Sequence, residues 1–130
     1  MSGRGWLKPL RRGHFWLGLW LGGILGVVVV CLLPGTDLPT VPLSDKVEHA
    51  LAFFALSAAA VQLFRRGWPL GVVALGLLAL GAGIEVAQGT LTVSRSMESA
   101  DFVADAIGVF AGLALGWTPV RDVLLRVDHL

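Results

Sequence analysis

The sequence contains little charge and almost no cysteine. Only 15% of its 130 residues are Asp, Glu, Lys or Arg, and Cys31 is the single thiol. One cysteine excludes an internal disulfide and leaves the redox compartment undetermined. Zinc-ligand spacings, a glycine-rich phosphate loop and nucleic-acid-binding motifs are missing too, so nucleic acid is not an expected partner. The net charge of +1 indicates no partner by itself.

Apolar residues make up 55% of the chain and stand in unbroken blocks rather than periodic stripes. Such blocks are typical of membrane helices, each of which needs about 20 mainly apolar residues. We therefore predict an all-α fold, an integral membrane bundle of four transmembrane helices. The spans are residues 15–33, 47–64, 70–87 and 102–117, forming one domain over 15–117 between a basic segment (1–14) and a short cytoplasmic tail (118–130). The lipid bilayer is the expected partner.

The first apolar block could instead be a signal sequence, because Arg4, Lys8, Arg11 and Arg12 precede it. Its apolar run is longer than the roughly 7–15 residues of a signal core, and no small-residue cleavage site follows. We expect the block to be retained as a span.

Lys and Arg are distributed unevenly around the predicted spans. If the N-terminus is cytoplasmic, eight of them lie on the cytoplasmic side, and two, Lys46 and Arg95, lie outside. Cytoplasmic segments of membrane proteins carry this excess of basic residues. The bias predicts an inner-membrane protein with both termini in the cytoplasm. Most acidic residues fall on the outer side.

Glycines recur every four residues in the first and fourth blocks: Gly18, Gly22 and Gly26, then Gly108, Gly112 and Gly116. Small residues at this spacing line one helix face and allow another backbone to come close. We expect close helix packing at both series, within the chain or across a homo-oligomer. A gap of lipid or substrate size beside the glycines is the alternative.

Polar side chains gather at the predicted outer ends of the last three spans. Several pairs are three or four residues apart and so share a helix face. Ionisable residues within a membrane are costly and are candidates for function. We predict a ligand-binding site formed by Asp45, Lys46, His49, Glu85, Gln88, Arg95, Asp101 and Asp105. The alternative is structural: the same groups pair with one another only to lock the bundle.

The same residues resemble the VanZ-like family, small membrane proteins named after a teicoplanin-resistance determinant. The match covers about residues 15–117 in three ordered blocks: Asp45, Lys46, His49 and Phe53; Glu85 and Gln88; Arg95, Asp101, Asp105 and Gly108. The family usually has Asn where Asp105 stands. The resemblance implies a multi-pass membrane protein connected with low-level glycopeptide resistance, and it implies no settled biochemical activity.

Three functions remain open. The first is recognition of a polar headgroup of an envelope lipid or glycopeptide at the outer leaflet, with Lys46 and Arg95 pairing with phosphate or carboxylate. The second is an intramembrane enzyme, whose catalytic candidates are His49 as general base, Asp45 four residues before it to orient the imidazole, Glu85 and Asp101. Asp105 could join Asp101 as an acid or metal ligand, and any need for a metal or cofactor stays open. The third is an oligomeric transporter, for which four spans are few.

Overall fold

The computed structural model describes residues 5–32, 45–91 and 99–130; the side chains at 45–46, 88–89, 91 and 99–101 lie outside this description. Within these residues the regular structure is helical. The elements are α1 (Gly13–Leu32), α2 (Asp45–Leu63), α3 (Trp68–Leu91), α4 (Ser99–Leu113), the 3-10 helices η3 (Ala114–Trp117) and η4 (Pro119–Asp122), and α5 (Val123–Asp128). The predicted all-α class is confirmed for this part of the chain.

Local sequence explains several helix boundaries. Gly67 has φ of +96°, a left-handed conformation that glycine adopts without steric cost, and it closes the turn between α2 and α3. Pro69 lies in the first turn of α3, where its missing N–H leaves no bond unmade. At the other boundary, α4 tightens into η3 and ends at Thr118, whose extended backbone precedes Pro119.

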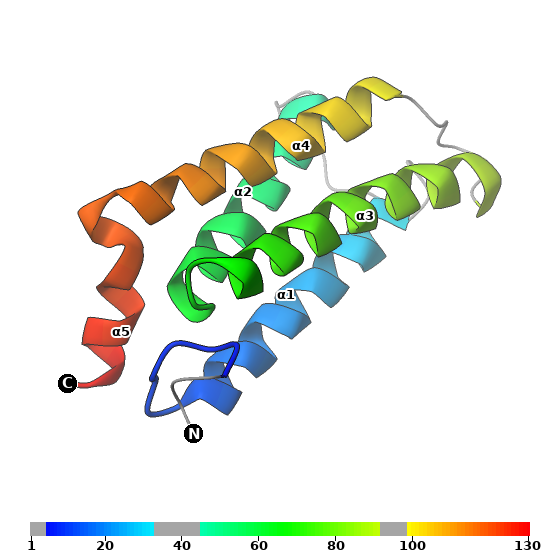
Figure 1. Cartoon of the computed structure of the whole chain (residues 1–130). Coiled ribbons are helices and arrows are strands. Elements are labelled where there is room, and N and C mark those ends of the chain that lie inside the picture. The colour runs from blue at the N-terminus through cyan, green and yellow to red at the C-terminus, as the bar shows by residue number, and fades with distance from the viewer. Residues whose placement is uncertain (1–4, 33–44, 92–98) are drawn as a thin grey trace.

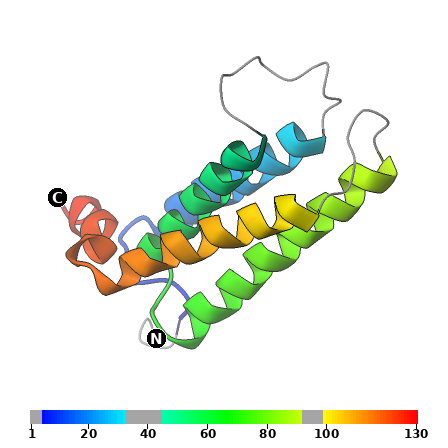
Figure 2. The ribbon, with the colours of Figure 1, turned by 90° about the horizontal axis from the view of Figure 1, so that it is seen from above.

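The four long helices run alternately up and down the bundle (Figure 1). We call the end where α1 begins, α2 ends and the chain termini lie the proximal end. The opposite end, where α2 and α4 begin, is the distal end. Both views show α2 and α4 side by side and α5 turned across the proximal end (Figures 1 and 2). The tail predicted at 118–130 is thus largely helical.

Two helical segments of the described chain, Gly13–Leu32 and Trp68–Ala87, are long and apolar enough to cross a membrane. A third candidate is Phe102–Trp117 together with Pro119–Asp128, which are bent by 85° relative to each other. Val47–Leu63, in α2, is apolar but shorter. Two or three of the four predicted spans therefore have the length and composition that a crossing requires.

Large apolar side chains cover much of the outside of the bundle. Leu25 on α1, Leu75 on α3 and Ile107 on α4 are 64%, 67% and 60% exposed. A water-soluble domain rarely exposes so many large apolar side chains, whereas lipid tails are a favourable environment for them. These faces indicate a membrane environment and contact with lipid.

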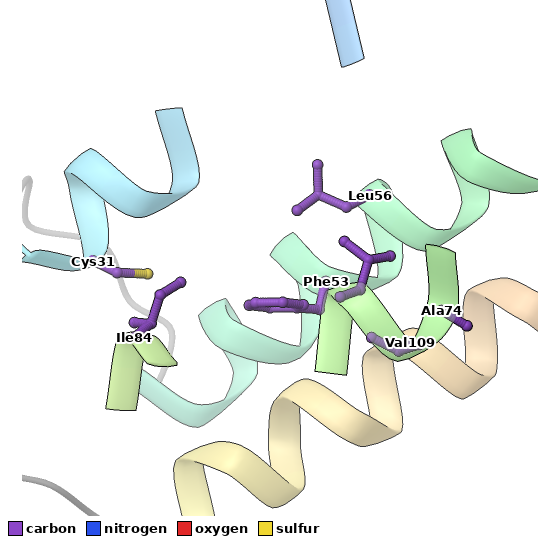
Figure 3. Close-up of a cluster of buried hydrophobic side chains, with 7 residues drawn as sticks. Cys31, Phe53, Leu56, Ala74, Ile84 and Val109 are labelled. Carbon is purple, nitrogen blue, oxygen red and sulfur yellow. The ribbon is translucent and has the colours of Figure 1, made fainter. Parts of the chain in front are cut away.

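The core lies where the four long helices meet. Phe53 of α2 and Val109 of α4 are fully buried near its centre, and Figure 3 shows Cys31 of α1 beside Ile84 of α3. A second apolar cluster at the proximal end combines Leu63 and Phe64 with residues of the N-terminal segment and α5. The core thus contains side chains from all four long helices, and the proximal cluster packs the N-terminal segment and α5 against them.

The two glycine series behave differently. Gly108 and Gly112 lie directly against the α2 backbone, as predicted. Gly18, Gly22 and Gly26, in contrast, are exposed, and a Cβ at any of them would meet no atom within 4 Å. The expectation of close packing at this series within the chain is wrong, because α1 turns its other face to the bundle. Packing across a homo-oligomer stays a prediction.

Candidate functional site

A buried histidine and a buried aspartate meet between α2 and α4. Nδ1 of His49 lies 2.9 Å from Oδ1 of Asp105, and the two side chains are 3% and 1% exposed. Because a carboxylate only accepts hydrogen bonds, an ionised Asp105 accepts one from the Nδ1–H of His49. This contact fixes the orientation of the imidazole ring.

The close approach of α2 and α4 brings this pair together. A Cβ on Gly108 would overlap the carbonyl oxygen of Ala50, and one on Gly112 would lie 2.6 Å from Cβ of Ser57. Only glycine leaves room for backbones this near to each other. Ser57 adds a buried hydrogen bond from its Oγ to the carbonyl oxygen of Val109, at 2.7 Å. The two helices are therefore held in one register around His49 and Asp105.

Helix α3 forms the third side of the site. A Cβ on Gly81 would lie 2.9 Å from Oδ2 of Asp105, so this glycine leaves space for the second carboxylate oxygen. Glu85 follows four residues later, on the same helix face and one turn nearer the distal end. Its side chain is only 5% exposed. Three helices therefore bury ionisable groups in the distal half of the bundle.

The structure places the other predicted site residues less completely. Asp45 starts α2, and Lys46, Gln88 and Asp101 lie in the terminal turns of α2, α3 and α4, but their side chains are outside the described part. Arg95 lies outside the described residues altogether. Of the predicted set, the structure joins His49 to Asp105 directly and buries Glu85 at the same end.

Ser57 lies on the same face of α2 as His49 and was not among the predicted site residues. It lies eight positions after His49, two turns along one face of α2, with the buried Phe53 between them. The spacing of His49, Phe53 and Ser57 was the available signal. No group of three His, Cys, Asp or Glu side chains with metal-ligand geometry occurs in the part of the chain that the structure describes.

A second polar cluster, at the proximal end, also went unpredicted. The buried carboxylate of Asp128 accepts hydrogen bonds from the backbone N–H groups of Arg11 and Arg12 and, at 2.9 Å, from Nε1 of Trp16. Burial alone would raise the pKa of Asp128. The hydrogen bonds from Trp16, Arg11 and Arg12 and the charge of Arg12 outweigh burial and hold the pKa below its ordinary value.

Lys8 forms a second tie at this end. Its Nζ donates to Oδ1 of Asp122 at 2.9 Å and to the carbonyl oxygen of Arg121 at 2.6 Å. The hydrogen bond from Lys8 is the main reason why the pKa of Asp122 lies below its ordinary value, although burial opposes it. Asp122 and Asp128 are the two acidic residues of the tail, where Arg121 and Arg126 also lie. This pattern was the available indication that the tail forms polar contacts with the basic N-terminal segment.

The fold and the buried polar pair define a class: a helical membrane protein with ionisable groups inside its bundle. Comparison of the chain with protein-family models, with curated proteins and with solved structures gives no match.

Proposed function

We propose that this chain is a four-span inner-membrane protein of VanZ-like type that recognises a polar headgroup at the outer leaflet. Its setting would be the cell envelope and resistance to glycopeptide antibiotics. The proximal end faces the cytoplasm in this proposal, because eight of the ten basic residues belong to that side. The alternating direction of the four long helices supports four spans with both termini on one side.

The observation that carries the proposal is the His49–Asp105 pair. Both side chains are almost completely buried in an otherwise apolar bundle, at 2.9 Å from each other. Taking two charged or polar groups out of water is costly, and apolar side chains of similar size would pack the bundle at least as well. Glu85 adds a third such group on a neighbouring helix. Such groups within a membrane are candidates for function by default.

The chemistry of the predicted set suits a headgroup with both charge and hydroxyl or amide groups. Lys46 and Arg95 would pair with a phosphate or carboxylate. Glu85 and Asp101 would accept hydrogen bonds from hydroxyl and amide groups, and the Gln88 amide would accept or donate them. The fixed imidazole of His49 would stand at the inner limit of the site, because α4 holds it through Asp105.

One observation favours catalysis as a second candidate. The Asp105 carboxylate orients the His49 ring through Nδ1, the arrangement by which a carboxylate prepares an imidazole to act as general base. Asp105 would then perform the orienting role that the sequence suggested for Asp45. The substrate in this case is an envelope lipid.

The test compares His49→Gln and Glu85→Gln with the unchanged protein in cells exposed to a glycopeptide antibiotic. Both substitutions remove a titratable group and keep a polar side chain of similar size. Glu48→Gln is the matched control, since it removes a half-exposed carboxylate next to His49. We expect normal membrane abundance with lost tolerance for the two site variants, and no change for Glu48→Gln. Full tolerance in both site variants would refute the proposal.

Binding separates the two candidates. For a recognition site, His49→Gln should weaken binding of the glycopeptide or its envelope lipid to purified protein. For an enzyme, the variant should still bind the lipid and fail to convert it. Mass spectrometry of lipids incubated with the protein measures conversion directly.

A further inference from the structure

A pocket of about 510 Å³ opens at the proximal end, far from His49 and Asp105. Three segments distant in the sequence line it: the N-terminal segment, the α2–α3 turn and η4 with the start of α5. Its ionisable lining consists of one carboxylate, Asp122, and four cations, Lys8, Arg65, Arg66 and Arg121. The pocket is therefore strongly basic.

Backbone hydrogen bonds build two of its walls. The N-terminal segment pairs with the end of α2 through the antiparallel bridge between Leu7 and Phe64. Lys8 N donates to the Leu63 carbonyl at 2.9 Å, and Arg65 N donates to the Trp6 carbonyl at 2.8 Å. The third wall, η4, is held by a hydrogen bond from the Lys8 ammonium to the Arg121 carbonyl oxygen. The basic residues are thus brought together by the fold.

The one carboxylate does not neutralise the pocket. Asp122 accepts a hydrogen bond from Lys8 at 2.9 Å and lies 3.8 Å from Nε of Arg121. Arg66 is exposed and has no carboxylate within ion-pair distance among the residues that the structure describes. Positive charge in excess of what the protein balances attracts an anion, and guanidinium groups suit phosphate oxygens in particular.

The residues around the pocket mouth are of the kinds found at the depth of lipid headgroups. Trp68 lines the pocket and packs edge-on against Trp6, with ring centres 4.7 Å apart, and both rings are exposed. Tryptophan is enriched at the boundary between lipid tails and water. Beside them, α5 lies across the bundle end and exposes Val123 and Val127, one turn apart. An apolar strip on a helix in this orientation suits the membrane interface.

We infer that this pocket binds the phosphate group of an anionic membrane phospholipid. The lipid tails would run along the exposed apolar faces of the bundle, and the phosphate would sit among Arg66, Arg121 and Lys8. Basic pockets between helices at the membrane surface hold lipid headgroups in this way. The inference concerns the end opposite to the proposed recognition site and needs only a membrane-embedded bundle, so either can fail without the other.

The experiment measures lipid binding by native mass spectrometry of the full-length protein in a neutral detergent. The probes are phosphatidylglycerol and phosphatidylcholine with identical tails, and soluble glycerol phosphate as competitor. The pocket variant is Arg66→Gln with Arg121→Gln. Its matched control is Arg11→Gln with Arg126→Gln, which removes the same charge from the same end outside the pocket. Arg66→Gln alone, at an exposed side chain, covers the case in which the double variant unfolds.

We expect the unchanged protein to bind phosphatidylglycerol at least about tenfold more tightly than phosphatidylcholine, and about a tenfold loss for each pocket arginine removed. The control should stay within about threefold of the unchanged protein. Arg66→Lys should bind more tightly than Arg66→Gln and more weakly than the unchanged protein, because it keeps the charge and loses the planar guanidinium. Equal losses in the pocket and control variants would overturn the inference, as would the absence of a lipid preference. Equally tight binding of glycerol phosphate would overturn the lipid as ligand and leave a site for free phosphate.

Discussion

His49 and Asp105 are 56 positions apart in the sequence, and their side chains meet at 2.9 Å inside the helical bundle. The contact depends on Gly108, one turn after Asp105, whose missing side chain lets α4 rest on the backbone of α2 at Ala50. The His49–Asp105 hydrogen bond and the contact of Gly108 with Ala50 thus stabilise the same helix packing. Tight packing excludes water from the pair, and the pair fixes the register of the two helices.

This coupling can be measured with a double-mutant cycle. His49→Ala and Asp105→Ala should each destabilise the bundle, because each removes a buried hydrogen-bond partner of the other. The double variant should be more stable than the sum of the single effects predicts, by about 0.5–3 kcal/mol. Reversible unfolding in mixed micelles provides the free energies. Strictly additive effects would show that the contact contributes nothing to stability.

The glycines of α4 provide a second prediction. Gly112→Ala should lower the free energy of unfolding by about 1–3 kcal/mol, because its Cβ would lie 2.6 Å from Cβ of Ser57 and force the helices apart. Gly76→Ala is the control, since no atom lies within 4 Å of its added Cβ. It should be neutral or stabilising by up to about 1 kcal/mol, as alanine favours a helix interior. The same unfolding assay tests both, and a loss of equal size in both would contradict the packing.

Asp128 should control the docking of α5. Asp128→Ala removes the acceptor for the Trp16 indole and for two backbone N–H groups, so the tail should separate from the N-terminal segment. Trypsin would then cleave faster after Arg121 and Arg126 in the variant. Leu130→Ala, at a side chain that is 91% exposed, should leave the cleavage rate unchanged. Identical rates for Asp128→Ala and the unchanged protein would mean that other contacts hold the tail.

Docking of the tail should also depend on pH. The pKa values of Asp122 and Asp128 are lower in the folded protein than their ordinary values, so the folded state binds these protons more weakly than the unfolded state does. The two carboxylates therefore stabilise the docked tail fully above about pH 4, and this contribution is lost as the pH falls below that value toward the lowered pKa values. Tryptic fragments are unsuitable at acid pH, so hydrogen exchange of residues 123–130 is the measurement. Asp128→Asn should flatten the pH profile, and an unchanged profile would count against the assignment.

The orientation is testable by cysteine labelling. In a Cys31→Ser background, a cysteine introduced at Ser44 should react with an impermeant reagent in intact cells, and one at Gly3 should react only after lysis. The reason is the excess of basic residues on the side of the termini. Labelling of Gly3 but not Ser44 in intact cells would reverse the orientation and place the basic pocket outside.

Local sequence was sufficient to predict the helical class and the approximate position of each of the four long helices, but not the helical structure of residues 119–128. Unbroken apolar blocks and the residues that end them, such as Arg65 and Pro119, are local signals, because each helix satisfies its own backbone hydrogen bonds. The positions of His49, Glu85 and Asp105 near the ends of alternating helices also placed them at one end of the bundle. These predictions follow from where each helix begins and ends and need no knowledge of packing.

Only the tertiary structure decided which groups meet. Spacing suggested Asp45, on the same helix face, as a partner of His49, and packing also brought Asp105 to His49 from another helix. The two glycine series have the same spacing but different surroundings: Gly112 contacts α2, whereas Gly22 faces away from the bundle. The face that a helix buries depends on its neighbours, which the spacing does not specify. The docking of Asp128 near Trp16 likewise joins segments at opposite ends of the chain. The helical repeat determines which residues share a helix face. Which neighbouring helix that face packs against depends on the free energy of packing the whole bundle.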